Sequence, residues 1–122
     1  MEIFVFVLLI SLLLIHEMDA IRLKEWRMFV VLKNLHDETA YRIFLLLHLP
    51  LYVVAIFIPA SGEALERVIL YYVVDAFLIA HSIIHFGFRK NSNNGFTSIF
   101  SKAIIYSLGI LAFIHLCILF FT

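Results

Sequence analysis

The stretch IHEMDA, residues 15–20, interrupts an apolar run that begins at residue 3. It places His16, Glu17 and Asp19 within four positions, just before a basic flank that starts at Arg22. The apolar run itself predicts a membrane-spanning helix. Ionisable side chains in such a helix are costly to bury, and for that reason they usually mark a functional site. We therefore expect the site of this protein to include this stretch.

The composition of the chain is that of a membrane protein. Of its 122 residues, 64% are hydrophobic and only 15% are charged, whereas a soluble domain is about 45–50% apolar. Nine basic residues balance nine acidic residues, so the charge gives no reason to expect a nucleic-acid partner. The lipid bilayer is the partner that this composition predicts.

Four apolar runs cover residues 3–21, 41–60, 66–88 and 98–121. Each is about 20 residues long, which is the length that crosses a bilayer core as an α-helix. The runs are continuous and lack the alternation of transmembrane barrel strands. We predict a single all-α domain, residues 1–122, built as an antiparallel bundle of four transmembrane helices.

The polar flanks predict how this bundle is oriented. Residues 22–35 mix basic and apolar side chains, which indicates a short amphipathic extension of the first helix in the cytoplasmic interface. Basic residues concentrate around the first and third connections, at Arg22, Lys24, Arg27, Lys33, Arg42, Arg89, Lys90 and Lys102. By the positive-inside rule these connections are cytoplasmic, and both termini are outside.

Histidines of three helices are expected at a similar depth. Counting about 1.5 Å per residue from Arg22 and Arg42 puts His16 and His48 roughly 9 Å above the cytoplasmic boundary. On the same count His85 and His81 lie roughly 6 and 12 Å above it. These two are an i,i+4 pair, so they project from the same face of their helix.

The candidate metal ligands in this slab are His16, Asp19, His48, His81 and His85. Imidazole and carboxylate donors of this kind suit zinc or iron. Glu17 lies in the same slab but is turned about 100° away from its neighbour His16. We take Glu17 as the candidate catalytic base of a zinc-dependent reaction.

Two further ionisable residues are expected at a common depth, further into the membrane than this slab. Asp75 lies fourteen positions from Arg89 and His115 lies thirteen positions from Lys102, so both are expected about 20 Å from the cytoplasmic boundary. A carboxylate and an imidazole at one depth can form a hydrogen bond across two membrane helices. We therefore predict a structural polar pair between the third and fourth helices.

The chain contains the segments His16-Glu17-Met18-Asp19-Ala20, Glu25-Trp26-Arg27, Tyr41-Arg42, Phe44 and Leu47-His48-x-Pro50-Leu51. Together these segments resemble an uncharacterised family of small bacterial four-helix membrane proteins. The likeness covers about the first half of the chain. The likeness implies the four-helix fold and a location in a bacterial inner membrane. It implies no activity, because the family has no known one. The His81/His85 spacing is also similar to that of membrane hydrolases that hold zinc through an intramembrane histidine pair, which is a fold-level analogy only.

Three functions are consistent with these patterns, and they leave open whether the protein is an enzyme. The first is a metal-binding membrane protein, with hydrolysis of a lipid substrate as the candidate reaction. The second is a non-enzymatic module that binds a partner helix or a lipid headgroup. The third is a b-type haem protein with His48 and His85 as axial ligands. Four short helices make a thin bundle, which is compatible with a homo-oligomer.

Overall fold

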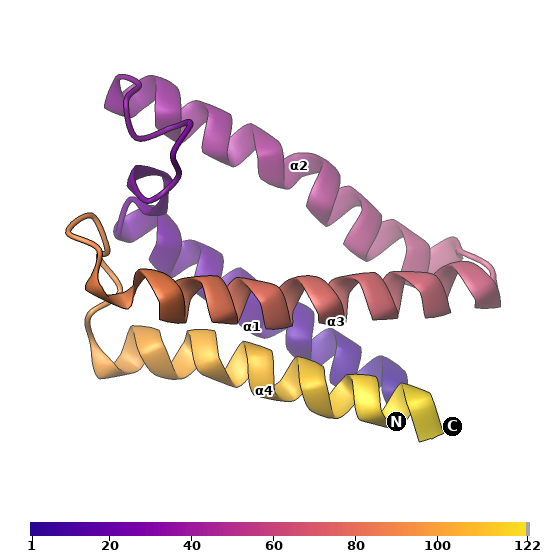
Figure 1. Ribbon diagram of the computed structural model, residues 1–122. Coiled ribbons are helices and arrows are strands. Elements are labelled where there is room, and N and C mark those ends of the chain that lie inside the picture. The colour runs from indigo at the N-terminus through magenta and orange to yellow at the C-terminus, as the bar shows by residue number, and fades with distance from the viewer. Residues whose placement is uncertain (122) are drawn as a thin grey trace.

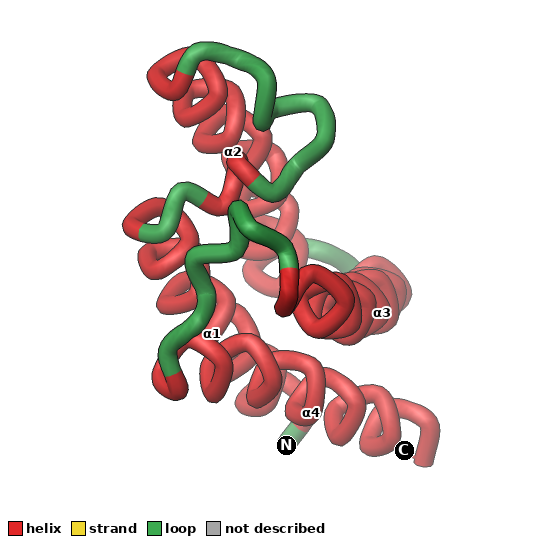
Figure 2. Tube along the Cα trace, turned by 60° about the vertical axis from the view of Figure 1, so that its left-hand side comes forward, coloured by secondary structure: helices red, strands yellow, loops and turns green. Residues whose placement is uncertain are grey.

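The computed structural model describes residues 1–121, so residue 122 of the predicted domain lies outside the described residues. Helices and loops account for the described chain, and no strand occurs in it (Figure 2). The four long helices are α1 (Glu2–Arg22), α2 (Asp37–Ser61), α3 (Ala64–Gly87) and α4 (Ile99–Phe121). All four are long and apolar enough to cross a membrane, which confirms the prediction of four spanning helices.

Three of these helices form the main core. Buried side chains of α1, α3 and α4 make one apolar cluster, with Leu9 and Leu13 from α1, Leu78 from α3, and Leu108 and Ala112 from α4. In the described chain, α2 contributes no buried residue to this cluster, and Figure 1 shows it diverging from the other three. The bundle therefore consists of a packed three-helix unit and a more loosely attached second helix.

The connections gather at one end of the molecule. Figure 1 places the segments that join α1 to α2 and α3 to α4 at one end, and both chain termini near the other. A second apolar cluster lies among these connections and includes Ala20, Trp26, Phe44, Phe96 and Ile105. This cluster attaches the start of α2 to the rest of the bundle.

The predicted helical extension over residues 22–35 does not form. The helix α1 ends at Arg22, and Lys24 adopts the left-handed conformation with φ 54° and ψ 53°. A single 3-10 turn, η1 (Glu25–Arg27), follows. The chain therefore reverses instead of continuing along the interface, and Trp26 is buried inside the protein.

Asp37, the first residue of α2, holds this reversal in place. Its carboxylate accepts hydrogen bonds from Lys24 Nζ at 2.7 Å, from Trp26 Nε1 at 2.9 Å and from Arg27 Nε at 3.0 Å. These three donors flank Glu25 on both sides in sequence. The contacts give the physical reason for the broken helix, because one carboxylate draws three neighbouring side chains back toward the start of α2.

The helices α3 and α4 approach each other closely at Gly109. The Ser82 hydroxyl of α3 donates a buried hydrogen bond of 2.7 Å to the carbonyl of Ile105. A Cβ atom added at Gly109 would lie 2.7 Å from Ser82 Oγ and 2.8 Å from Ser82 Cβ. Small residues allow such close contacts in membrane bundles, where van der Waals packing drives helix association.

We expect Gly109→Ala to lower the free energy of unfolding by about 1–3 kcal/mol, the usual cost of overpacking a core. Gly87→Ala is the matched control, because a Cβ atom there meets no other described atom within 4 Å and the backbone of Gly87 is already α-helical. Thermal unfolding in detergent, followed by circular dichroism, measures both variants. Equal destabilisation by the two substitutions would show that close packing at Gly109 does not matter.

Candidate metal centre

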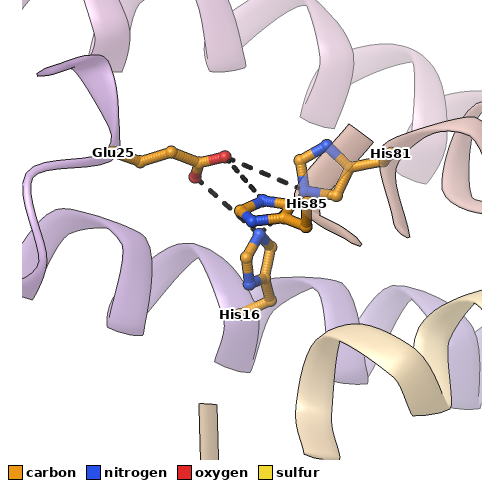
Figure 3. A group of neighbouring side chains, drawn as sticks. All are labelled: His16, Glu25, His81 and His85. Carbon is orange, nitrogen blue, oxygen red and sulfur yellow. Dashed lines mark hydrogen bonds and ion pairs between the residues drawn. The ribbon is translucent and has the colours of Figure 1, made fainter. Parts of the chain in front are cut away.

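Four side chains from three segments meet near the connection end of the bundle. His81 and His85 project from one face of α3, and His16 projects from α1. Glu25 reaches them from η1, because the chain reverses after α1. Figure 3 shows the three imidazoles and the carboxylate turned toward one another. We call these four residues the histidine–glutamate group.

The polar atoms of the histidine–glutamate group lie at ligand-to-ligand distances. His16 Nε2 is 2.8 Å from His81 Nε2, and His85 Nε2 donates to Glu25 Oε1 at 3.0 Å. Glu25 Oε2 lies 3.8 Å from His16 Nε2, and Glu25 Oε1 lies 3.9 Å from His81 Nε2. One donor atom from each residue can be chosen so that all four lie within 4.8 Å of one another.

These separations are near those of a single tetrahedral ion. Zinc binds imidazole nitrogen at about 2.0–2.1 Å, so neighbouring ligands of a tetrahedral site lie about 3.3 Å apart. Four of the separations, from 2.8 to 3.9 Å, lie around that value, whereas the group as a whole spreads to 4.8 Å, so an ion would draw its donors closer together. Three imidazoles and one carboxylate suit zinc or iron. The histidine–glutamate group could therefore hold a metal ion.

The group is buried, and Glu25 has no ordinary cationic partner. Glu25 is 2% exposed and His16 is 0% exposed. Within residues 1–121, no Lys or Arg lies within 4.0 Å of the Glu25 carboxylate, and its only ion-pair contacts are the three histidines. Because a buried charge must be compensated, a positive charge is required among these imidazoles, either as a proton or as a metal ion.

The surroundings of Glu25 favour its ionised form. Burial raises the pKa of this carboxyl group, but the hydrogen bond from His85 and the nearby His16 and His81 imidazoles outweigh burial. The pKa of Glu25 is therefore below its ordinary value, and the side chain is a carboxylate at neutral pH.

Aromatic rings hold the imidazoles in position. Phe96, which precedes α4, packs against His85 and His16 with ring-centre distances of 4.7 and 5.4 Å. Phe77 stacks on His81 at 5.6 Å. The Nδ1 atoms of His16 and His85 are buried and have no hydrogen-bond partner among residues 1–121, so the polar contacts of both rings are made at Nε2.

The remaining predicted ligands lie in other contacts. His48 Nε2 is 3.0 Å from Glu17 Oε2, and His48 Nδ1 donates to the Phe44 carbonyl at 2.6 Å. Asp19 accepts hydrogen bonds from Arg22 Nε at 3.0 Å and from a terminal guanidinium nitrogen of Arg22 at 2.8 Å. Neither His48 nor Asp19 belongs to the histidine–glutamate group, which takes its carboxylate from Glu25 instead.

The structure also brings Asp75 and His115 together. His115 Nδ1 lies 2.9 Å from Asp75 Oδ2 and 3.1 Å from Asp75 Oδ1, and both residues are fully buried between α3 and α4. This contact lies in the main core beside the rings of Phe6 and Tyr71. The position of this pair in the main core suits the structural role that the sequence analysis predicts for Asp75 and His115.

A cavity of about 420 Å³ opens beside the histidine–glutamate group. Its polar lining residues are Glu17, Glu25, His48, His81 and His85. Its apolar lining residues are Met28, Phe29, Phe44, Leu47, Leu51, Phe77, Ile84 and Phe88. The Glu17–His48 pair and the histidine–glutamate group therefore face a common space between α2 and α3.

Glu25 is the residue that sequence reasoning missed. In a continuous helix Glu25 would lie nine positions after His16, on the opposite face of the helix. No Gly or Pro marks the break at residues 23 and 24. The one available signal was the segment Glu25-Trp26-Arg27, which belongs to the resemblance described above.

Comparisons with known proteins identify a family for this chain and name no activity. No curated protein and no solved structure matches the chain. A family model described as "Family of unknown function (DUF6713)" matches residues 2–122, and the chain belongs to this family.

Proposed function

We propose that this protein is a multi-pass membrane protein that binds one zinc or iron ion through His16, Glu25, His81 and His85. The observation that carries this proposal is the buried Glu25 carboxylate, which faces three imidazoles and no Lys or Arg within residues 1–121. A divalent ion would compensate this charge and satisfy all four donors at once. The donor separations suit such an ion.

We infer that the four helices run antiparallel, with the metal site near the cytoplasmic face of a bacterial inner membrane. The supporting observation is that the two connections flanked by most of the basic residues lie at the same end of the molecule (Figure 1). The positive-inside rule places that end in the cytoplasm and both termini outside.

As the reaction, we infer hydrolysis of an ester or amide bond in a membrane lipid. Water adds across the acyl bond, which yields a carboxylic acid and an alcohol or amine. A catalytic metal site keeps one coordination position open, so three of the four donors would hold the ion during the reaction, and the ion would supply Lewis-acid chemistry. Glu17 lines the same cavity as Glu25 and His81, so it is the candidate base that takes a proton from water and returns it to the leaving group.

His48 is the residue that would position this base. Its Nε2 atom lies 3.0 Å from Glu17, and its Nδ1 atom already donates to the Phe44 carbonyl. These two contacts fix the ring of His48 beside the Glu17 carboxylate. Asp19, which binds Arg22, has no role in this scheme.

We expect element analysis of the protein purified in detergent to find close to one zinc or iron ion per chain. The double variant His81→Ala/His85→Ala should lose nearly all of it, because it removes two of the four donors. His36→Ala is the matched control, since His36 is exposed and lies outside the group.

The same sample separates the alternatives. Wild-type protein that is folded and free of metal would contradict the proposal and favour the non-enzymatic binding module. A strong visible absorption band would favour haem, with His48 and His85 as the axial candidates.

Metal affinity should also depend on Asp37, which binds no metal in this scheme. Asp37→Ala removes the acceptor that holds Lys24, Trp26 and Arg27 around Glu25. We expect metal affinity to fall by about 10–100-fold, as is typical when the support of a ligand is removed. Competition with a chromogenic chelator measures the change.

Glu38→Ala is the control for this measurement, because Glu38 is exposed and pairs with Arg42 on its own helix. Equal affinities in Asp37→Ala and wild type would show that Glu25 is positioned without Asp37, or that Glu25 is not a ligand.

A further inference from the structure

We propose that the cavity beside the histidine–glutamate group binds a lipid with a single acyl chain and an uncharged ester or amide headgroup, such as a monoacylglycerol. This inference rests on the proposed metal site for the position of the headgroup. The binding itself is a property of the cavity, so it can be measured with or without the metal ion.

The position of the cavity indicates that its ligand comes from the membrane. The cavity lies between α2 and α3, two helices that are long and apolar enough to span a bilayer. Leu47 and Leu51 line it from α2, and Phe77 and Ile84 line it from α3. Because Leu47, Phe77 and Ile84 are also exposed on the outer surface of these helices, a lipid molecule can approach the cavity from within the bilayer.

The lining indicates an amphiphile. Most of the wall is aliphatic or aromatic, which suits a hydrocarbon chain. The polar side chains gather around Glu17, His48 and the histidine–glutamate group. An acyl chain against the apolar wall would bring its ester or amide group to these residues. A volume of about 420 Å³ is near the lower end of the roughly 300–1,000 Å³ of small-molecule sites, which favours one chain over two.

The charges of the wall indicate an uncharged headgroup. Among residues 1–121, no Lys or Arg lines the cavity. Glu17 lies beside His48, and Glu25 lies among its three imidazoles. When no metal ion is bound, an anionic headgroup, such as a free carboxylate or phosphate, would therefore meet two carboxylates and none of the described Lys or Arg side chains. An ester can accept hydrogen bonds here, an amide can also donate them, and neither adds a charge.

Trp26 provides a built-in reporter for the test. It is the only tryptophan of the chain, and its ring centre is 5.6 Å from that of Phe44, which lines the cavity. A monoacylglycerol with a brominated chain should therefore quench Trp26 fluorescence in protein reconstituted into nanodiscs. With metal removed by a chelator, we expect saturable quenching that unlabelled monoacylglycerol reverses, and weaker quenching by the brominated free fatty acid of equal chain length at neutral pH.

The matched variants are Leu51→Phe and Val53→Phe. Leu51 lines the cavity, whereas Val53 lies two positions further on the same helix, turned by about 200°, and does not line it. We expect the half-saturating concentration to rise about tenfold in Leu51→Phe, since overpacking obstructs the chain. Val53→Phe should bind like the wild type.

Two results would overturn this inference. One is equal quenching curves for wild type and for a Leu51→Phe variant that keeps its metal content. The other, which needs no variant, is equal or tighter binding of the fatty-acid anion by wild type from which metal has been removed. Metal content is measured in the same samples. Retained lipid binding by wild type from which a chelator has removed a bound metal ion supports both proposals, whereas wild type that is purified without metal and still binds the lipid refutes only the metal site.

Discussion

An ionised carboxylate cannot stay unpaired inside an apolar bundle, and this constraint governs the arrangement of the whole molecule. Four carboxylates in the middle of the bundle or near its connection end have a basic or imidazole neighbour. The pairs are Glu25 with the three histidines, Glu17 with His48, Asp75 with His115, and Asp19 with Arg22. Three of these four contacts join different segments of the chain. The charged side chains are costly to bury, but their pairing therefore also helps to fix how the segments pack.

The four spanning helices could be predicted from sequence because lipid leaves few alternatives. A continuous apolar run of about 20 residues must satisfy its own backbone hydrogen bonds, and a helix does so. The grouping of His16 with His81 and His85 was also accessible, because depth along a helix follows from residue count and the i,i+4 spacing sets a common face.

The contribution of Glu25 was not accessible in that way. It depends on a left-handed residue at Lys24 and on three donors that converge on Asp37. These are tertiary contacts between a loop and the start of the next helix, and residue spacing alone does not encode them. The position of His48 depends likewise on the divergence of α2, which places His48 beside Glu17 and apart from the three grouped histidines.

The spread of the donors along the chain bears on how the protein is made. His16 and Glu25 belong to the first span and its connection, whereas His81 and His85 lie near the end of the third. During synthesis, a nascent chain that has inserted only its first two spans holds one imidazole and one carboxylate of the set. The complete group forms only after α3 has entered the bilayer and brought its two histidines to His16 of α1, so the ribosome must pass residue 85 before an ion could find all four donors.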